Sequence, residues 1–213
     1  MVKRRISVAI ISIMVSLATY AKDIHDFFVS EPNQIFNHLT TGTRLDMIDY
    51  YNSGAIVELE NQIYGTSKLT KLTDNYISVK LSENLLTEVK MLPISKKDTI
   101  LVVSQTIYAP TPDSKISIYD TQWQELELAK YFKTPTLADF IDAPRKGELS
   151  LEMIEPLFPF LMIEYKLNAD NNNIEAILGA KSLLTTERYK KIEPILTDTL
   201  NYTLKGRKFK QIK

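Results

Sequence analysis

The sequence predicts an α+β fold with N-terminal helices, a large antiparallel meander sheet covered on one face by helices, and C-terminal hairpins. Residues 31–52 have the apolar spacing of helices, whereas the middle of the chain alternates apolar and polar residues as half-buried strands do. Short polar links such as Asp74-Asn75 and Ser95 to Asp98 leave no room for crossover helices between those strands. The strands are therefore expected to run antiparallel.

The first 21 residues are expected to be a cleaved signal peptide. Residues 3–5 are Lys-Arg-Arg, and residues 6–20 form an uncharged, largely apolar run that is shorter than the roughly 20 residues of a membrane-spanning helix. Cleavage is expected after Ala18 or Ala21, and a retained N-terminal anchor is the alternative. Residues 22–213 are then expected to form a single α+β domain, periplasmic or secreted, without a transmembrane segment.

The composition, 44% hydrophobic and 24% charged, is typical of a folded globular protein and excludes several chemistries. The chain has no Cys, so it cannot form disulfides, thiolate metal sites or a thiol nucleophile. Its two His, His25 and His38, lack metal-ligand spacing, and its 6 Gly form no phosphate-binding loop. We therefore expect no metal, no cofactor and no nucleic acid partner.

The predicted N-terminal helical region is either two short helices or one broken helix. Ser30-Glu31-Pro32 is typical of a helix start, Gly42 interrupts the pattern, Thr43 can cap a second segment, and Gly54 ends it. The apolar positions of this region are Ile35, Phe36, Leu39, Leu45, Ile48 and Tyr51.

Strands are predicted where apolar residues occupy every second position. These residues are Val57 and Leu59, Ile77, Val79 and Leu81, Val89 and Met91, and Ile116 and Ile118. Ile100–Val103 is instead continuously apolar, as in a central strand. Residues 136–157 return to a helical pattern with a capping box at Thr136 and Asp139. Asp142–Glu148, with Pro and Gly among charges, is either a boundary that subdivides the domain or a loop.

Two hairpins are predicted after residue 160. The first joins Ile163, Tyr165 and Leu167 to Ile174, Ala176 and Leu178 through the polar turn Asp170–Asn173. A short helix over residues 186–193 ends at Pro194. The second hairpin joins Leu200, Tyr202 and Leu204 to Phe209 and Ile212 through Lys205-Gly206.

Asp46 and Asp49 are the most suggestive pair of carboxylates in the sequence. They stand three residues apart on a helix that is expected to bury Leu45 and Ile48, and Arg44 precedes them. In the structural interpretation, Asp46 lies in the first helical turn, where the helix dipole favours an anion, and Arg44 neutralises it. In the functional interpretation, Arg44, Asp46 and Asp49 bind a ligand, or the two carboxylates serve a hydrolase as its acid and base.

Asp113 and Ser114 form a second candidate binding site, immediately before a predicted strand. Ser114 has neither a Gly-x-Ser-x-Gly context nor a plausible histidine partner, so we assign no catalytic residue. An Asx-type turn that enters the strand is the structural interpretation.

Charge is unevenly distributed along the chain. From Lys181 onward there are nine basic and three acidic residues, whereas residues 22–180 carry a balance of −9. The basic end could contact an anionic envelope surface. A lysine-protected edge strand is the interpretation that we favour, because exposed lysines prevent two edges from pairing.

Several short segments together resemble a group of known sequences. They are residues 43–51 (Thr-Arg-Leu-Asp-Met-Ile-Asp-Tyr-Tyr) before Ser53-Gly54, Met91-Leu92-Pro93, residues 109–114 leading to Ile118-Tyr119-Asp120 and Trp123, and the pattern around Tyr202 and Phe209. This pattern resembles an uncharacterised family of secreted Bacteroidales proteins, classed as a domain of unknown function. The element order is also similar to periplasmic domains of the β-lactamase-inhibitor-like type, which is an analogy of fold alone.

The resemblance implies export and a bacterial lineage but no activity. That lineage in turn implies O-glycosylation candidates at Thr99 and Thr199, in Asp98-Thr99-Ile100 and Asp198-Thr199-Leu200. We expect an exported cell-envelope protein that acts as a non-enzymatic binding or interaction module, with an envelope protein or a glycan as its partner. The alternative is a carboxylate-dependent hydrolase that uses Asp46 and Asp49.

Overall fold

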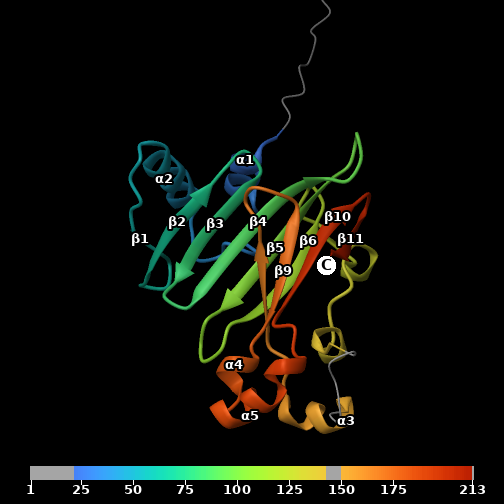
Figure 1. Cartoon of the computed structure of the whole chain (residues 1–213). Coiled ribbons are helices and arrows are strands. Elements are labelled where there is room, and N and C mark those ends of the chain that lie inside the picture. Colours follow the sequence, from blue (N-terminus) through green and yellow to red (C-terminus); the bar gives the residue numbers. More distant parts are fainter. Residues whose placement is uncertain (1–21, 143–149, 213) are drawn as a thin grey trace, which may run out of the picture.

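The described part of the chain folds into three layers, two antiparallel sheets and a set of N-terminal helices (Figure 1). The computed structural model describes residues 22–142 and 150–212. A seven-stranded sheet lies in the middle, with the helices on one face and a four-stranded sheet on the other. The predicted α+β class is confirmed. The predicted signal peptide, residues 1–21, and most of the predicted boundary at 142–148 lie outside the described residues.

The helical elements are α1 (Ile24–Ser30), α2 (Thr41–Asn52), η1 (Leu128–Lys130), η2 (Leu137–Phe140), α3 (Leu151–Ile154), η4 (Glu155–Leu157), α4 (Ala180–Leu183), α5 (Thr186–Ile192) and η5 (Glu193–Ile195), where η denotes a 3₁₀ turn. The strands of the larger sheet are β1 (Leu59–Glu60), β2 (Thr66–Leu72), β3 (Tyr76–Ser82), β4 (Leu85–Pro93), β5 (Thr99–Ile107), β6 (Asp113–Tyr119) and β7 (Glu125–Leu126). The smaller sheet contains β8 (Ile163–Leu167), β9 (Asn173–Leu178), β10 (Thr199–Lys205) and β11 (Lys208–Ile212).

The larger sheet is the predicted meander, with β1 to β7 as neighbours in sequence order. In β3, Ile77 and Val79 pack toward the N-terminal helices, whereas Tyr76 packs on the opposite face, toward the second sheet. β5 is covered on both faces, which explains why Ile100–Val103 is continuously apolar.

Two details at the start of the sheet differ from the prediction. Pairing begins at Leu59, so Val57, expected in a strand, lies before β1 and is exposed. β2 was not predicted at all, because its sequence Thr-Ser-Lys-Leu-Thr-Lys-Leu has few apolar residues. Only Leu69 of this strand is deeply buried among apolar residues, against the N-terminal helices.

The expected helix that starts at Ser30 is wrong. Ser30 ends α1, and residues 31–40 are turns and bends. The buried carboxylate of Glu31 accepts hydrogen bonds from four successive backbone N–H groups, those of residues 33 to 36, at 2.7 to 3.3 Å. These bonds satisfy donors that a helix would otherwise have paired. α2 is one continuous helix that includes Gly42 and is capped by Thr40, and Gly54, at φ +84°, follows its end as predicted.

The smaller sheet contains both predicted hairpins, joined edge to edge. β8 pairs with β9 through Ile163↔Leu178 and Tyr165↔Ala176, and β10 pairs with β11 across the predicted turn. β9 also pairs with β10, so one sheet of order β11-β10-β9-β8 results. Between the hairpins, α5 ends before Pro194 as predicted. Before the first hairpin, η2 carries the predicted capping box.

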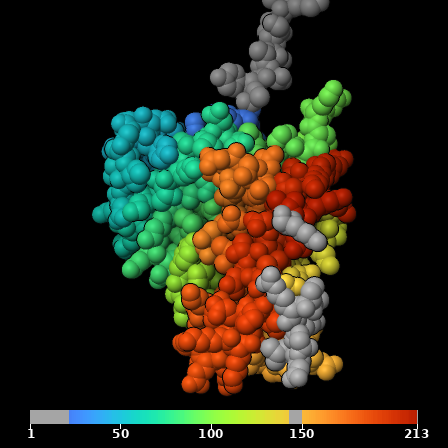
Figure 2. Space-filling view, in the orientation of Figure 1, coloured from blue at the N-terminus to red at the C-terminus, as the bar shows by residue number. Residues whose placement is uncertain are grey.

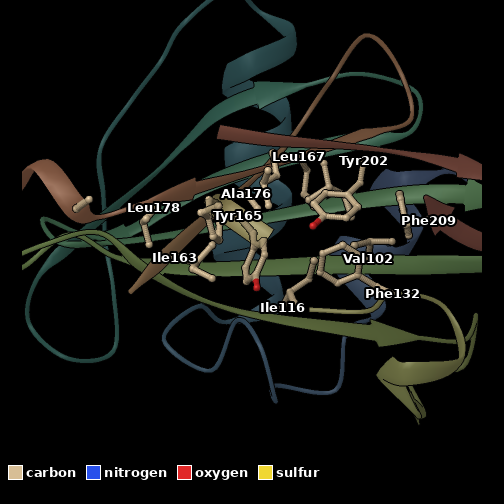
Figure 3. Packing of buried hydrophobic residues seen from close by; sticks show 14 of the residues in the cluster. Val102, Ile116, Phe132, Ile163, Tyr165, Leu167, Ala176, Leu178, Tyr202 and Phe209 are labelled. Carbon is tan, nitrogen blue, oxygen red and sulfur yellow. The ribbon is translucent and has the colours of Figure 1, made fainter. Parts of the chain in front are cut away.

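Phe132 belongs to the core between the two sheets and lies near Tyr202 and Phe209 (Figure 3). Its ring meets Tyr165, Tyr202 and Phe209 edge to face, with centroid distances of 5.7, 5.0 and 6.0 Å. The ring is 1% exposed. Three of the four rings come from different strands of the smaller sheet, so Phe132 connects that sheet to the segment after β7.

We predict that Phe132→Ala destabilises the fold by about 3 to 5 kcal/mol, because it removes a buried ring and leaves a cavity. Phe160→Ala is the matched control, since Phe160 is 72% exposed, and it should change the unfolding free energy by about 0.5 kcal/mol or less. Urea unfolding followed by far-UV circular dichroism measures both. Equal effects of the two substitutions would contradict the central role of Phe132.

Candidate functional site

Arg44, a predicted binding residue, is completely buried and holds the N-terminal helices together. Its Nη1 donates to the carbonyl oxygens of Phe28 and Glu31, each at 2.9 Å, and its Nη2 donates to the side chain of Asn33. The carboxylate of Glu31 lies 3.6 Å from Nη1. Burial lowers the pKa of Arg44 from its ordinary value, and the charge of Glu31 opposes this effect. Arg44 is therefore a structural residue of the α1–α2 connection.

Asp46 and Asp49 lie on the exposed face of α2, away from Arg44. Two parts of the structural interpretation are wrong: Asp46 is beyond the first turn of α2, which starts at Thr41, and Arg44 pairs with Glu31 instead. Leu45, expected to be buried, is 48% exposed, because the buried face of α2 carries Arg44, Met47 and Ile48. Within the described residues, neither aspartate side chain has an ion-pair or hydrogen-bond partner. The structure does not bring this pair together with any other candidate residue.

Asp113 and Ser114 hold the edge of the second sheet. Asp113 Oδ1 accepts a hydrogen bond from the backbone N–H of Ile163 at 3.1 Å, and Ser114 Oγ accepts one from Tyr165 at 2.9 Å. Ser104 Oγ, from β5, donates to the carbonyl oxygen of Tyr165 at 2.7 Å. These side chains replace a neighbouring strand for the outer edge of β8. The predicted Asx-type turn is therefore wrong, since the aspartate bonds to a strand 50 residues away.

The same edge continues to β4, where it meets two buried charged residues that the sequence did not single out. Lys90 Nζ donates to the carbonyl oxygen of Ala169 at 2.7 Å, and Glu88 accepts from the backbone N–H of Leu167. Glu88 Oε1 also accepts from the hydroxyl of Tyr76 at 2.5 Å. We call Asp113, Ser114, Ser104, Glu88 and Lys90 the β8 clamp. Both charged residues alternate with Val89 and Met91 along β4, and the second sheet covers the face on which they lie.

A groove at the other side of the larger sheet is the second feature that the sequence did not reveal. It has a volume of about 980 Å³ and is open to solvent. Its lining comes from β1, β2, β3 and their turns: Glu58, Glu60, Asn61, Gln62, Tyr64, Gly65, Thr66, Ser67, Lys68, Lys80, Ser82 and Glu83. In Figure 2 the orange and red C-terminal segments cover only part of the larger sheet and leave the teal side, which contains β1 and β2, free.

Tyr64 stands fully exposed on the turn beside this groove. Its backbone adopts φ 60°, which is uncommon for a bulky residue and costs about 1 to 3 kcal/mol. Asn61 maintains the turn: its Oδ1 accepts from the N–H groups of Ile63 and Gly65 at 3.1 and 3.0 Å. Its Nδ2 donates to Ser67 Oγ and to the carbonyl oxygen of Leu81 at 3.0 and 3.1 Å. The exposed tyrosine is thus presented by a rigid turn.

The groove contains three carboxylates and two ammonium groups. Glu58 lies 3.0 Å from Lys68 Nζ and accepts a hydrogen bond from Thr66 at 3.2 Å. These two hydrogen bonds, with the charge of Lys68, lower the pKa of Glu58, so it remains ionised at neutral pH. No group of three His, Asp or Glu side chains in the described part of the chain is arranged to hold a metal ion.

The basic C-terminal residues divide into two groups. Arg188, Lys190 and Lys191 are exposed on α5, before β10, whereas Lys205, Arg207 and Lys208 surround the turn after it. The seven residues of β10 separate the two groups by about 20 Å. β11 is an outer strand of its sheet, as the favoured edge-strand interpretation requires. Arg207 also pairs with Asp98 at 2.7 Å, beside a second hollow of about 300 Å³.

The two glycosylation candidates occupy equivalent places in the two sheets. Thr99 begins β5 opposite Pro93, and Thr199 begins β10 opposite Ile177. Both side chains are half-buried. Modification of either residue stays a prediction.

The comparisons with known proteins agree with this fold. A family model described as "Protein of unknown function (DUF3256)" matches residues 16–209. The chain belongs to this family. The domain-of-unknown-function resemblance expected from the sequence is thereby confirmed, whereas secretion and the bacterial lineage stay predictions.

A solved structure shares the fold of this DUF3256 protein. It is a domain of an uncharacterized protein from Porphyromonas gingivalis W83, with a TM-score of 0.77 and 20% sequence identity. The match covers 89% of this chain and 98% of that chain. At this identity the likeness shows the fold alone. No curated protein matches the sequence.

We predict that Arg44→Met destabilises the DUF3256 fold by about 3 to 5 kcal/mol, because it leaves the buried carboxylate of Glu31 without its cation. Asp46→Asn is the control on the exposed face of the same helix and should change the free energy of unfolding by about 0.5 kcal/mol or less. Urea denaturation measures both values. A small change in the free energy of unfolding for Arg44→Met, together with a large change for Asp46→Asn, would contradict the structural role of Arg44.

Proposed function

We propose that this protein is an exported binding protein of the cell envelope and that it holds a glycan in the groove at β1–β3. The observation that carries the proposal is Tyr64, a fully exposed ring on a rigid turn with strained backbone, beside a groove of polar side chains. Backbone strain of this kind is common at functional sites. A tyrosine provides a broad, rigid contact area with little loss of side-chain entropy on binding.

The chemistry of the groove suits a glycan because a sugar ring has C–H groups on its faces and hydroxyls around its edge. The exposed ring of Tyr64 can stack on such a face. The carboxylates of Glu58, Glu60 and Glu83 accept hydrogen bonds from hydroxyls, while Gln62 and Lys80 can donate to them. The side chains that line the groove are almost all polar or charged, and its three carboxylates against two ammonium groups disfavour a nucleic acid.

Binding is favoured over hydrolysis at this groove. A glycosidase requires two carboxyl groups in different environments, one of which donates a proton. Glu58, held by Lys68 and Thr66, has a lowered pKa and cannot serve as that acid at neutral pH. Asp46 and Asp49, the residues of the alternative hydrolase, line neither the groove nor the second hollow.

Export is part of the proposal and rests on the N-terminal sequence. No helix within the described residues combines the length and apolar character that crossing a membrane requires. We predict that protein isolated from its native cells begins at Thr19 or Lys22 and is released by osmotic shock. N-terminal sequencing of the released fraction measures this. Protein that retains Met1 and sediments with the membranes would contradict it.

If the groove binds a glycan, Tyr64→Ala should specifically weaken glycan binding. The protein should bind one or more members of an array of bacterial-surface and host-type oligosaccharides, and Tyr64→Ala should weaken that binding about tenfold or more, since buried aromatic contacts dominate interface energy. Tyr50→Ala is the matched control: Tyr50 is 44% exposed but lies on α2, outside the groove. Its affinity should equal that of the wild type.

Two outcomes would contradict this function. Equal binding by Tyr64→Ala and Tyr50→Ala would show that the groove is not the site. Release of new reducing ends from a bound oligosaccharide would show hydrolysis and would overturn the assignment as a binding protein.

A further inference from the structure

Glu88 differs from the other residues of the β8 clamp in one respect. Its Oε1 is hydrogen-bonded, but its Oε2 has no hydrogen-bond partner among the described residues although the side chain is only 5% exposed. An ionised carboxylate in this position leaves a charged oxygen buried without a partner, which is costly. A protonated carboxyl group avoids that cost.

The groups that face Glu88 come from three directions. From β3, the hydroxyl of Tyr76 donates to Oε1. From β8, the backbone N–H of Leu167 and the charge of Lys166 favour the ionisation of Glu88, whereas Glu164 opposes it. Lys166 is itself 3.5 Å from Glu164. From the end of β5, the hydroxyl of Tyr108 donates to Glu164 at 2.7 Å. The two carboxylates therefore stand in one electrostatic cluster, each with its own tyrosine.

We propose that Glu88 is a proton-controlled latch between the two sheets, which holds β8 against β4 when protonated and loosens this contact when ionised. Loosening follows because ionisation places a charge on a buried carboxylate whose Oε2 has no hydrogen-bond partner among the described residues, near the carboxylate of Glu164. The cost of burying this charge outweighs the hydrogen bonds from Tyr76 and Leu167, which favour the ionised form. The remaining clamp residues keep the other parts of β8 in place, so the change is local to Leu167 and its neighbours. This latch does not depend on the function of the groove.

The direction of the pH effect follows from the burial of Glu88. Burial, with a smaller contribution from Glu164, raises the pKa of Glu88 to about 7, whereas an unfolded glutamate titrates near 4.3. The closed state therefore binds the proton more tightly than an open state does. The stabilisation that Glu88 contributes is complete below the unfolded pKa and is lost as the pH rises through about 7.

Hydrogen exchange measured by mass spectrometry tests the latch in the full chain. After division by the intrinsic exchange rate, the protection of residues 166–168 should fall about tenfold or more between pH 5.5 and pH 8. Glu88→Gln preserves the shape but cannot ionise, so its protection should be the same at both values. Glu187→Gln, an exposed carboxylate on α5, is the control and should behave as the wild type.

Two further variants should shift the pH at which the protection of β8 falls, without removing Glu88. Tyr76→Phe deletes a hydrogen bond that favours the ionised form, so the transition should move to higher pH. Glu164→Gln deletes a repelling charge, so it should move to lower pH. Corrected protection that is equal at pH 5.5 and 8 in the wild type would overturn the latch. A Glu88→Gln protein whose protection depends on pH as that of the wild type does would also overturn the latch. If Glu88→Gln does not fold, a Tyr76→Phe protein with the wild-type pH dependence would overturn it.

Discussion

The arrangement of the two sheets depends on how the backbone N–H and C=O groups at the outer edge of β8 find hydrogen-bond partners. An edge strand presents a row of N–H and C=O groups that water or another strand must pair. Here the row lies on the face of the larger sheet, and side chains from β6, β5 and β4 meet its alternate residues in turn. The clamp thus takes the place of a fifth strand in the smaller sheet, and it sets where that sheet lies on the larger one.

This placement of the second sheet decides which surfaces remain free. The apolar half of the larger sheet, around Val102, Ile116 and Ile118, is covered and forms the core shared with Phe132. On the same face, the part around β1, β2 and the end of β3 is uncovered and polar, and there the Asn61 turn presents Tyr64 beside the groove. The position of the second sheet therefore accounts for both the buried β8 clamp and the open polar groove.

The N-terminal helices follow a similar rule on the opposite face. Glu31 and Arg44 are buried together and use their hydrogen bonds to fold a ten-residue connection that has no regular structure. A short sequence segment with charged residues near apolar ones is thus compatible with either a surface site or a buried connection. Only the direction of the side chains distinguishes the two, and for Arg44 that direction is inward.

Periodicity by itself determined the α+β class, the meander order, both hairpins and the ends of α2 and α5, because each depends on neighbours close in sequence. It did not reveal β2, the turns at 31–40, or the roles of Asp113 and Ser114, whose partners lie 50 residues or more away. Glu88 and Lys90 alternate with apolar residues, and alternation says only that one face is buried. Whether a second sheet covers the other face is decided by tertiary packing, and for the same reason the groove beside Tyr64 exists only in the folded chain.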